Sequence, residues 1–444
     1  MLSKYSELLL SREAKLGIWG LGYLGYSDLT RYAMNGVKCV VSDYNPERLM
    51  RMEKEFLPED TLLAYLDILP KNVDIASNVE VKKEYEELLH PDILIHIFSV
   101  PTQNKTQPTN KWLMEALKVF IRVVDVKYTI PPVLILESSL IPGTMDRMIL
   151  PFLRENGLLP GENILVGLCS RRDWFDEKGK VLDFPRIVSG VTKETTDIVA
   201  EIIEIAGATV IKASDYRIAE VLKCVENSYQ QIETTIANQL AMAFPDIDIR
   251  ETLRLATIRS NIPYALPNFG TGGYDIPIAC QYVMEGATIP EYLTLFRETN
   301  YADQSMPKII SEVILRRKVK NVGFLGISYK SNVGISAMSP GMLIIEYLKG
   351  KIGELKCYDP FYSPEEVNKL LGISALSFPE ELLGMEAIIV NVGHSAFRRV
   401  PWCKLKEKLI NCLIVLDNMG IWADLPWDET NIIYHMIGSA GWDK

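Results

Sequence analysis

The residues with the clearest chemical meaning form a glycine-rich turn near the start of the chain. Gly20-Leu-Gly22-Tyr-Leu-Gly25 follows an apolar stretch at 15–19 and opens a helical stretch that runs to about residue 35. Glycines let a backbone approach a pyrophosphate, and a helix N-terminus supplies N–H groups and partial positive charge. The turn therefore predicts a dinucleotide site, the alternative being a tight strand–helix turn without a ligand.

An acidic residue stands where such a site reads the ribose. Asp43 ends the next apolar stretch, at 37–43. A carboxylate at this place accepts hydrogen bonds from both ribose hydroxyls and repels a 2′-phosphate. The predicted cofactor is therefore NAD rather than NADP.

These residues need a parallel sheet to position them, and the sequence predicts two. Short apolar runs alternate with amphipathic stretches in both halves of the chain, which is typical of strand–helix–strand units. Between them, 213–244 lacks Gly and Pro and has apolar residues at helical spacing, so it predicts one long helix. The predicted strands are 15–19, 37–43, 93–100 and 132–137 in the first half, and 321–326, 355–359, 387–392 and 413–417 in the second.

The predicted fold class is α/β, with two Rossmann-like parallel-sheet domains joined by the long central helix and a helical dimerisation segment. The predicted domains are an NAD-binding domain over 1–210, a central helical domain over 211–315 and a C-terminal α/β nucleotide-binding domain over 316–444.

Composition excludes several classes of protein. Of 444 residues, 48% are hydrophobic and 23% are charged, which is typical of a globular chain, and the net charge of −10 argues against nucleic acid as a partner. We expect no membrane span and no signal peptide, because the apolar runs are too short. The seven cysteines form no CxxC pair or Cys/His cluster, so we expect no metal site and a cytoplasmic protein.

Other motifs follow the glycine turn in a specific order. They are Val100-Pro101-Thr102, Glu137-Ser138-Ser139-Leu140-Ile141-Pro142-Gly143-Thr144, Pro185-Arg186-Ile187-Val188, Lys223 with Asn227, Phe269-Gly270-Thr271-Gly272-Gly273, Tyr329-Lys330 with Ser339-Pro340, Tyr358-Asp359-Pro360, and His394. With this order, the chain resembles the UDP-glucose/GDP-mannose (nucleotide-sugar) dehydrogenase family over nearly its whole length.

The resemblance implies an NAD-binding N-terminal domain, a helical dimer core and a C-terminal domain for the nucleotide of a nucleotide sugar. It implies oxidation of a primary alcohol to a carboxylate in two hydride transfers, the second through a cysteine thiohemiacetal. The implied cofactor-binding residues are Gly20, Gly22, Tyr23, Leu24, Gly25, Asp43, Arg48, Val100, Pro101, Thr102 and Ser138. The implied substrate-binding residues are Arg171, Phe269, Gly270, Gly272, Gly273, Tyr274 and Lys330.

The family pattern breaks at the reacting residues. Its loop reads G-x-G-G-x-C-x-P-K-D, and here Asp275 takes the place of the cysteine, while Ile278 and Ala279 replace the Lys and the Asp. Arg171 takes the place of the family's Glu. A carboxylate cannot form a thiohemiacetal, so the second oxidation of the usual reaction loses its nucleophile.

The groups that one hydride transfer needs remain. In the family register, Lys223 accepts the proton of a carbinol, and Asn227, four residues further on the same helix face, holds a developing alkoxide or a water. Ser139 hydrogen-bonds a substrate hydroxyl, and Asp275 is an alternative base.

We therefore expect an NAD-dependent oxidoreductase acting on the CH–OH group of a nucleotide sugar, in carbohydrate biosynthesis, through one two-electron or transient oxidation. Two alternatives stay open. One is a conventional 6-dehydrogenase that forms a uronate, and the other is a non-catalytic protein that binds NAD or a nucleotide.

Overall fold

The computed structural model describes residues 2–56, 75–104, 106–175 and 181–444. The chain forms two compact units. The first comprises 1–176, 180–226 and 281–290, and the second comprises the remaining residues. The segment predicted as a helical domain, 211–315, is divided between these units, so the three domain boundaries stay predictions.

The first unit is built on an eight-stranded sheet in the order β12-β11-β8-β7-β4-β1-β2-β3. Its strands run parallel except that β11 is antiparallel to β8. They are β1 (Lys15–Trp19), β2 (Cys39–Ser42), β3 (Val79–Val81), β4 (Ile93–Phe98), β7 (Val133–Leu136), β8 (Leu165–Ser170), β11 (Arg186–Gly190) and β12 (Val210–Lys212). Two hairpins pair β5 (Gln103–Asn104) with β6 (Gln107–Pro108), and β9 (Asp173–Phe175) with β10 (Val181–Asp183).

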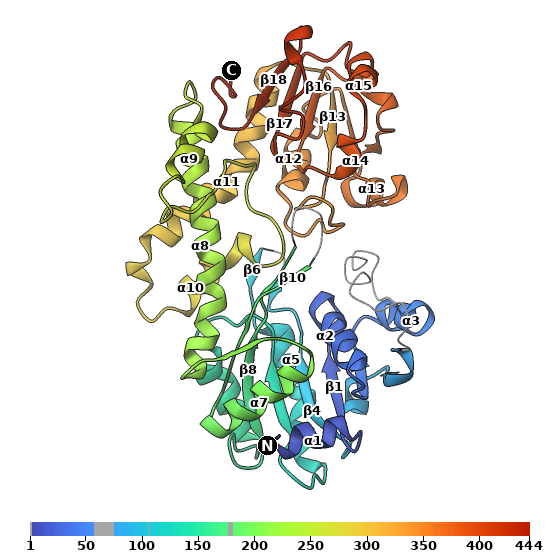
Figure 1. Cartoon of the computed structure of the whole chain (residues 1–444), viewed down its shortest axis with the longest axis vertical. Coiled ribbons are helices and arrows are strands. Elements are labelled where there is room, and N and C mark those ends of the chain that lie inside the picture. Colours follow the sequence, from blue (N-terminus) through green and yellow to red (C-terminus); the bar gives the residue numbers. More distant parts are fainter. Residues whose placement is uncertain (1, 57–74, 105, 176–180) are drawn as a thin grey trace. The chain divides into compact units, whose positions relative to one another are not determined.

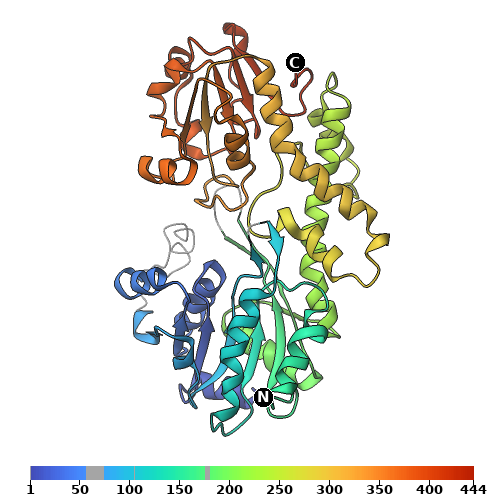
Figure 2. The same cartoon turned by 180° about the vertical axis from the view of Figure 1, so that it is seen from behind.

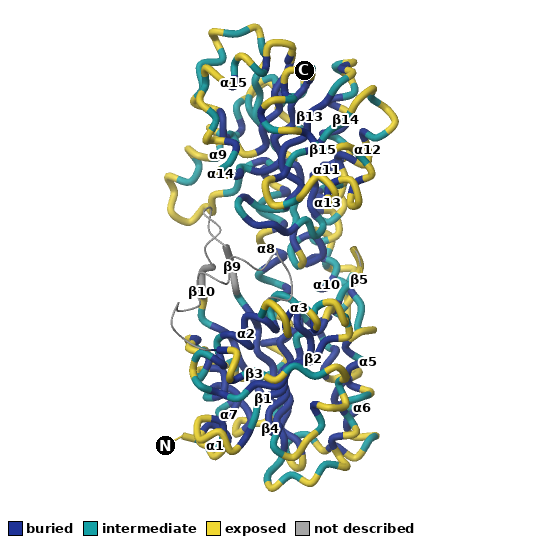
Figure 3. Tube along the Cα trace, turned by 90° about the vertical axis from the view of Figure 1, so that its right-hand side faces the viewer, coloured by how far each residue is buried: buried dark blue, intermediate teal, exposed yellow. Residues whose placement is uncertain are grey.

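Helices cover both faces of this sheet: α7 lies in front of it in Figure 1, and α5 lies in front of it in Figure 2. The helices are α1 (Lys4–Leu10), α2 (Tyr23–Met34), α3 (Pro46–Glu55), α5 (Lys111–Phe120), α6 (Leu150–Glu155) and α7 (Lys193–Ile205), with a π-helical turn at Met145–Ile149 before α6. Apart from Lys15 at the start of β1, every residue of β1 and β4 is buried, as the dark tube in Figure 3 shows. Burial on both faces explains why they read as continuous apolar runs.

The second unit contains a six-stranded parallel sheet in the order β15-β14-β13-β16-β17-β18. The strands are β13 (Asn321–Leu325), β14 (Glu354–Tyr358), β15 (Ser374–Ala375), β16 (Ala387–Val390), β17 (Ile414–Asp417) and β18 (Ile433–Met436). The later helices of the chain are α9 (Ile249–Ala256), α10 (Ala279–Gly286), α11 (Thr294–Arg316), α12 (Pro340–Leu348), α13 (Pro364–Leu371), α14 (Ser395–Arg398) and α15 (Trp402–Lys408).

Both sheets reverse their strand order beside their first strand, between β1 and β4 and between β13 and β16. Ligands of open α/β sheets bind at the carboxyl ends of the strands at such a point. The predicted fold class, with two Rossmann-like parallel sheets, is confirmed. All predicted strands appear: β1 has the predicted bounds, β14 is shifted by one residue, and the others are one to three residues shorter.

The long helix is also confirmed. It is α8 (Tyr216–Ala243), with 28 residues. Among the residues that the structure describes, no helix is both long and apolar enough to cross a lipid bilayer.

Candidate functional site

The glycine turn joins β1 to α2 and has the backbone that a dinucleotide site needs. Gly20 has φ +100°, a conformation that favours glycine, and a Cβ on Gly25 would lie 2.0 Å from the carbonyl oxygen of Gly20. Gly22 is the N-cap of α2, and a Cβ there would have only Arg48 within 4 Å, at 3.9 Å. The turn is therefore tight where strand and helix meet and open where a phosphate would approach.

Asp43 directly follows β2 and is held against this turn. Its Oδ2 accepts a hydrogen bond from the backbone N–H of Leu21 at 2.6 Å, and its Oδ1 accepts one from Asn45 at 2.7 Å. Arg48 Nη1 lies 3.5 Å from Asp43 Oδ2. The structure thus brings Gly22, Asp43 and Arg48 together as the sequence predicts, and these residues fit NAD.

The carboxyl ends of β4 and β7 meet next to this turn. The Ser138 hydroxyl donates to the Val100 carbonyl at 2.7 Å and accepts from the Val100 N–H at 3.0 Å. The Thr102 hydroxyl donates to the Ser139 carbonyl at 2.5 Å, and the Tyr282 hydroxyl donates to the Thr102 carbonyl at 2.5 Å. These contacts fix the two predicted cofactor segments relative to one another.

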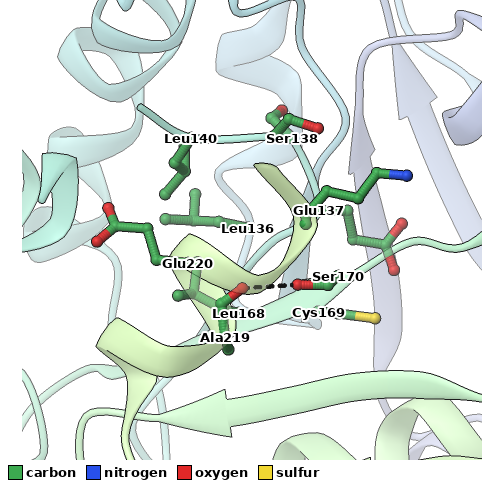
Figure 4. A pocket seen from close by; sticks show the side chains of 11 residues that line it. Leu136, Glu137, Ser138, Leu140, Leu168, Cys169, Ser170, Ala219 and Glu220 are labelled. Atoms are coloured by element: carbon green, nitrogen blue, oxygen red, sulfur yellow. Dashed lines mark hydrogen bonds between the residues drawn. The ribbon is translucent and has the colours of Figure 1, made fainter. Parts of the chain in front are cut away.

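A pocket lies in the first unit at the carboxyl ends of β7 and β8. It is lined by three hydroxyls, a thiol, an amine and two carboxylates, among apolar side chains: Leu136, Glu137, Ser138, Ser139, Leu140, Leu168, Cys169, Ser170, Ala219, Glu220 and Lys223. Figure 4 shows Ser170 donating to the Ala219 carbonyl, at 2.9 Å. The structure therefore brings the predicted base, Lys223, together with Ser138 and Ser139, and Asn227 follows one turn later on α8.

Glu220, one turn before Lys223, was not predicted from the sequence. It is buried, and its two carboxylate oxygens accept the backbone N–H groups of Gly143 at 2.7 Å and Met145 at 2.9 Å. Burial raises the pKa of Glu220, although these N–H groups counteract it. The carboxylate thus ties the loop after β7 to α8. An acidic residue on the buried face of a predicted amphipathic helix is the signal that could have found it.

The expectation that Arg171 meets substrate is not supported. Its guanidinium is 3% exposed, pairs with Asp28 and lies 3.2 Å from Glu137. Arg186 completes the cluster, 3.3 Å from Asp28 and 3.8 Å from Glu137. Two cations and two carboxylates thus balance inside the first unit, and the side chain that replaces the family's Glu takes a structural part there.

The loop that carries Asp275 belongs to the second unit and is anchored at both ends. Asp303, on α11, accepts the Thr271 N–H at 2.8 Å and the Thr271 hydroxyl. The Gln231 side chain, on α8, donates to Asp303 at 3.0 Å and to the Pro277 carbonyl at 3.1 Å. Sequence reasoning missed Gln231 and Asp303, because their partners lie far away along the chain and leave no local pattern.

The glycines of this loop pack against Tyr329. A Cβ on Gly272 would lie 2.7 Å from Tyr329 Cβ, and one on Gly273 would lie 3.0 Å from its ring. Asp275 is half-buried beside Tyr329. Burial is the main cause that raises the pKa of the Tyr329 phenol, and the negative charge of Asp275 raises this pKa further. Tyr274 is 46% exposed, as a ligand contact would require.

Two further side chains of this loop region are buried in the protein interior. Phe269 is completely buried in the core of the second unit, so the substrate contact predicted for its ring is not supported. Cys280 is also completely buried, and burial raises the pKa of its thiol to about 12. A thiol in this state is neither ionised nor accessible at neutral pH.

The second sheet has its own anchored turn after the first strand. Asp359, following β14, accepts the N–H groups of Ile327 at 2.9 Å and Ser328 at 3.0 Å, as Asp43 does in the first unit. His394 Nε2 lies 3.2 Å from Asp359 Oδ2. Lys330 is half-buried in the loop that this carboxylate holds. In the described part of the chain, no group of three or more His, Cys, Asp or Glu residues could hold a metal ion.

The first unit thus defines a dinucleotide-binding protein of the Rossmann class. Comparison with known sequences specifies it further. Residues 14–206 match the NAD binding domain of the UDP-glucose/GDP-mannose dehydrogenase family, and residues 323–424 match the UDP binding domain of the same family. The chain belongs to this family of NAD-dependent nucleotide-sugar dehydrogenases.

Relatives match along almost the whole chain. A UDP-N-acetyl-D-mannosamine dehydrogenase of Methanococcus aeolicus is 24% identical over 441 residues, covering 96% of this chain and 95% of the relative. Protein CapL of Staphylococcus aureus is 26% identical over 440 residues, covering 94% and 97%. The structure of a UDP-D-ManNAc dehydrogenase from Pyrococcus horikoshii shares the fold, with a TM-score of 0.78, 19% identity and coverage of 96% and 100%.

Proposed function

We propose that this chain oxidises the primary alcohol of a UDP-linked sugar with NAD and ends at the uronate, with a 2-acetamido sugar of the N-acetylmannosamine type as the first candidate. The whole-length similarity to proteins named UDP-N-acetyl-D-mannosamine dehydrogenase supports the substrate. The reaction type, oxidation of an alcohol with NAD, is supported by the pocket that brings Lys223 together with Ser138 and Ser139 in the NAD-binding unit.

The residues of this pocket divide the first oxidation between them. Bound NAD supplies the hydride acceptor. Lys223 takes the hydroxyl proton as the C–H hydride leaves, Ser139 donates a hydrogen bond to the same oxygen, and Asn227 holds the oxyanion or a water. The apolar lining from Leu136, Leu140 and Leu168 limits water around this proton transfer.

The second oxidation needs a tetrahedral carbon that again carries a hydride. Water adds to the aldehyde to give a geminal diol, and loss of a second hydride to a second molecule of NAD and of a proton to the base gives the carboxylic acid. This route requires no thiol, in agreement with Asp275 at the family's cysteine position. Lys223 then serves as the base that takes the proton of the diol.

A second candidate is a reaction that stops after one hydride transfer. Two observations favour it: Asp275 cannot form a thiohemiacetal, and the nearby Cys280 is completely buried. Stoichiometry separates the candidates. With UDP-N-acetylmannosamine and excess NAD, two NADH per sugar and a uronate in the mass spectrum support the first, and one NADH with an aldehyde or ketone supports the second.

A non-catalytic NAD-binding protein would give neither product. Lys223→Met serves as the diagnostic variant, because it keeps the length of the side chain and removes the base. Turnover that falls at least about 100-fold while NAD affinity stays unchanged fits the proposed role. Tight NAD binding without turnover of any nucleotide sugar would instead show a binding protein.

We also propose a homodimer formed through α8. Ile218, Tyr229 and Ile236 share a face of this helix at helical spacing and are 51%, 63% and 50% exposed. An apolar stripe of this length is a surface that a second copy can cover. Light scattering after size-exclusion chromatography should give twice the chain mass, and Tyr229→Glu with Ile236→Glu should give the monomer.

A further inference from the structure

An exposed pair of aromatic rings lies beside the ribose-reading carboxylate of the first unit. Tyr44, which directly follows Asp43, and Trp112, on the first turn of α5, lie with their ring planes 3° apart and their centroids 6.2 Å apart. The two residues are 64% and 38% exposed. Rings of this size normally avoid water, so an exposed, near-parallel pair is a candidate surface for a planar ligand.

The place of the pair in the sheet indicates which ligand. Tyr44 belongs to the loop after β2, and α5 is the helix that follows β4, while β1 lies between these two strands. The aromatic contact therefore joins the loop after β2 to the helix after β4, on either side of the glycine turn that follows β1, where a dinucleotide lies in this class of sheet. In this class of sheet the acidic residue after the second strand reads the adenosine ribose, so the base on that ribose would extend toward the residue that follows Asp43.

The backbone around Tyr44 is firmly held. The Asp43 carboxylate accepts the Asn45 N–H at 2.7 Å on the far side of Tyr44, and Tyr85 lies close to Tyr44. Tyr85 itself stacks on the buried Trp19, with centroids 4.9 Å apart. The exposed ring thus stands on a fixed support, and little ordering is needed when a base stacks on it.

We propose that Tyr44 and Trp112 form the aromatic contact for the adenine ring of NAD. Lys111, whose Nζ lies 4.4 Å from the Trp112 ring centroid, supports the Trp112 side chain. The inference rests on the NAD-binding domain and is independent of the substrate and of the number of oxidation steps.

Calorimetric titration of the full chain with 5′-AMP and with NAD, without sugar substrate, tests the proposal. Trp112→Ala and Tyr44→Ala should each lower the affinities for 5′-AMP and for NAD about tenfold, which is the loss expected for one base–aromatic contact. Trp112→Phe should retain most of the affinity. Trp402→Ala, which removes a ring from the Trp402–Trp427 pair of the second unit, should leave both affinities unchanged.

A second readout follows the ring itself. Binding of 5′-AMP should change the tryptophan fluorescence of the wild-type chain, and Trp112→Phe should abolish that change. Wild-type affinity for AMP and NAD in variants that keep the wild-type melting temperature would overturn the proposal. If Trp112→Ala does not fold, Tyr44→Ala decides, because its side chain is largely exposed.

Discussion

Replacement of Arg171 by methionine tests whether this side chain binds substrate or holds the first unit together. Arg171→Met keeps the length of the side chain and removes its contacts with Asp28, Glu137 at 3.2 Å and the Ser27 hydroxyl at 3.0 Å. Arg186 then faces two buried carboxylates alone. Breaking a buried ion pair from one side costs about 3–5 kcal/mol, so we expect the melting temperature of this unit to fall by roughly 10 °C.

The loss of stability caused by Arg171→Met should also depend on pH. The missing positive charge matters less when one of the two carboxylates binds a proton and becomes neutral. Burial and the neighbouring Asp28 hold the pKa of Glu137 well above its usual range, whereas Arg171 lowers it. The folded variant therefore binds a proton more readily than the unfolded chain, and its stability falls as pH rises toward the folded-state pKa. We expect the stability deficit to shrink from about pH 8 to about pH 5.5.

Differential scanning calorimetry of the full chain measures the deficit, and steady-state kinetics with the nucleotide sugar measure binding. Arg172→Met is the matched control. Arg172 pairs with Glu226 in a half-exposed contact, 3.1 Å from Nε to Oε2, which is worth less than about 1 kcal/mol. Asp28→Asn combined with Arg171→Met should recover part of the lost stability.

One outcome would refute this reasoning. If Arg171→Met keeps the wild-type melting temperature while KM for the nucleotide sugar rises, the guanidinium reaches substrate and the cluster is not its main partner. A lowered melting temperature with an unchanged KM in the surviving folded fraction supports the structural part assigned to Arg171.

Three further predictions concern separate parts of the molecule. Asp43→Asn should weaken the binding of NAD about 10- to 100-fold, as calorimetry can measure, because a charge-assisted acceptor for the ribose is lost. It should also reduce the preference for NAD over NADP, and an unchanged affinity for NAD would contradict this prediction. Asp303→Asn loosens the Asp275 loop, so kcat should fall about tenfold while the affinity for NAD is unchanged. An equal loss of kcat and of NAD affinity would indicate general unfolding instead. Iodoacetamide at pH 8 should alkylate the exposed Cys403 long before Cys280, as peptide mass spectrometry can show, because burial raises the pKa of Cys280 to about 12.

The local pattern of the sequence was sufficient for much of the fold and for the cofactor. Strands buried on both faces must be continuous apolar runs, so β1, β4 and β7 could be read directly. The glycine turn and Asp43 share one strand–helix–strand unit, where the spacing along the chain fixes the geometry. The long helix α8 likewise follows from its periodicity alone.

The partners of individual side chains were decided only by the tertiary structure. The sequence suggested that Arg171 could bind a ligand. In the structure, however, its guanidinium pairs with Asp28, more than a hundred residues away along the chain, inside the first unit. Within the first unit, Glu220 anchors the loop after β7, and within the second unit, Gln231 and Asp303 anchor the loop of Asp275. The partners in these contacts lie far apart along the chain. A motif records chemistry within a few residues, whereas charge balance and loop anchoring depend on which distant segments the fold packs together.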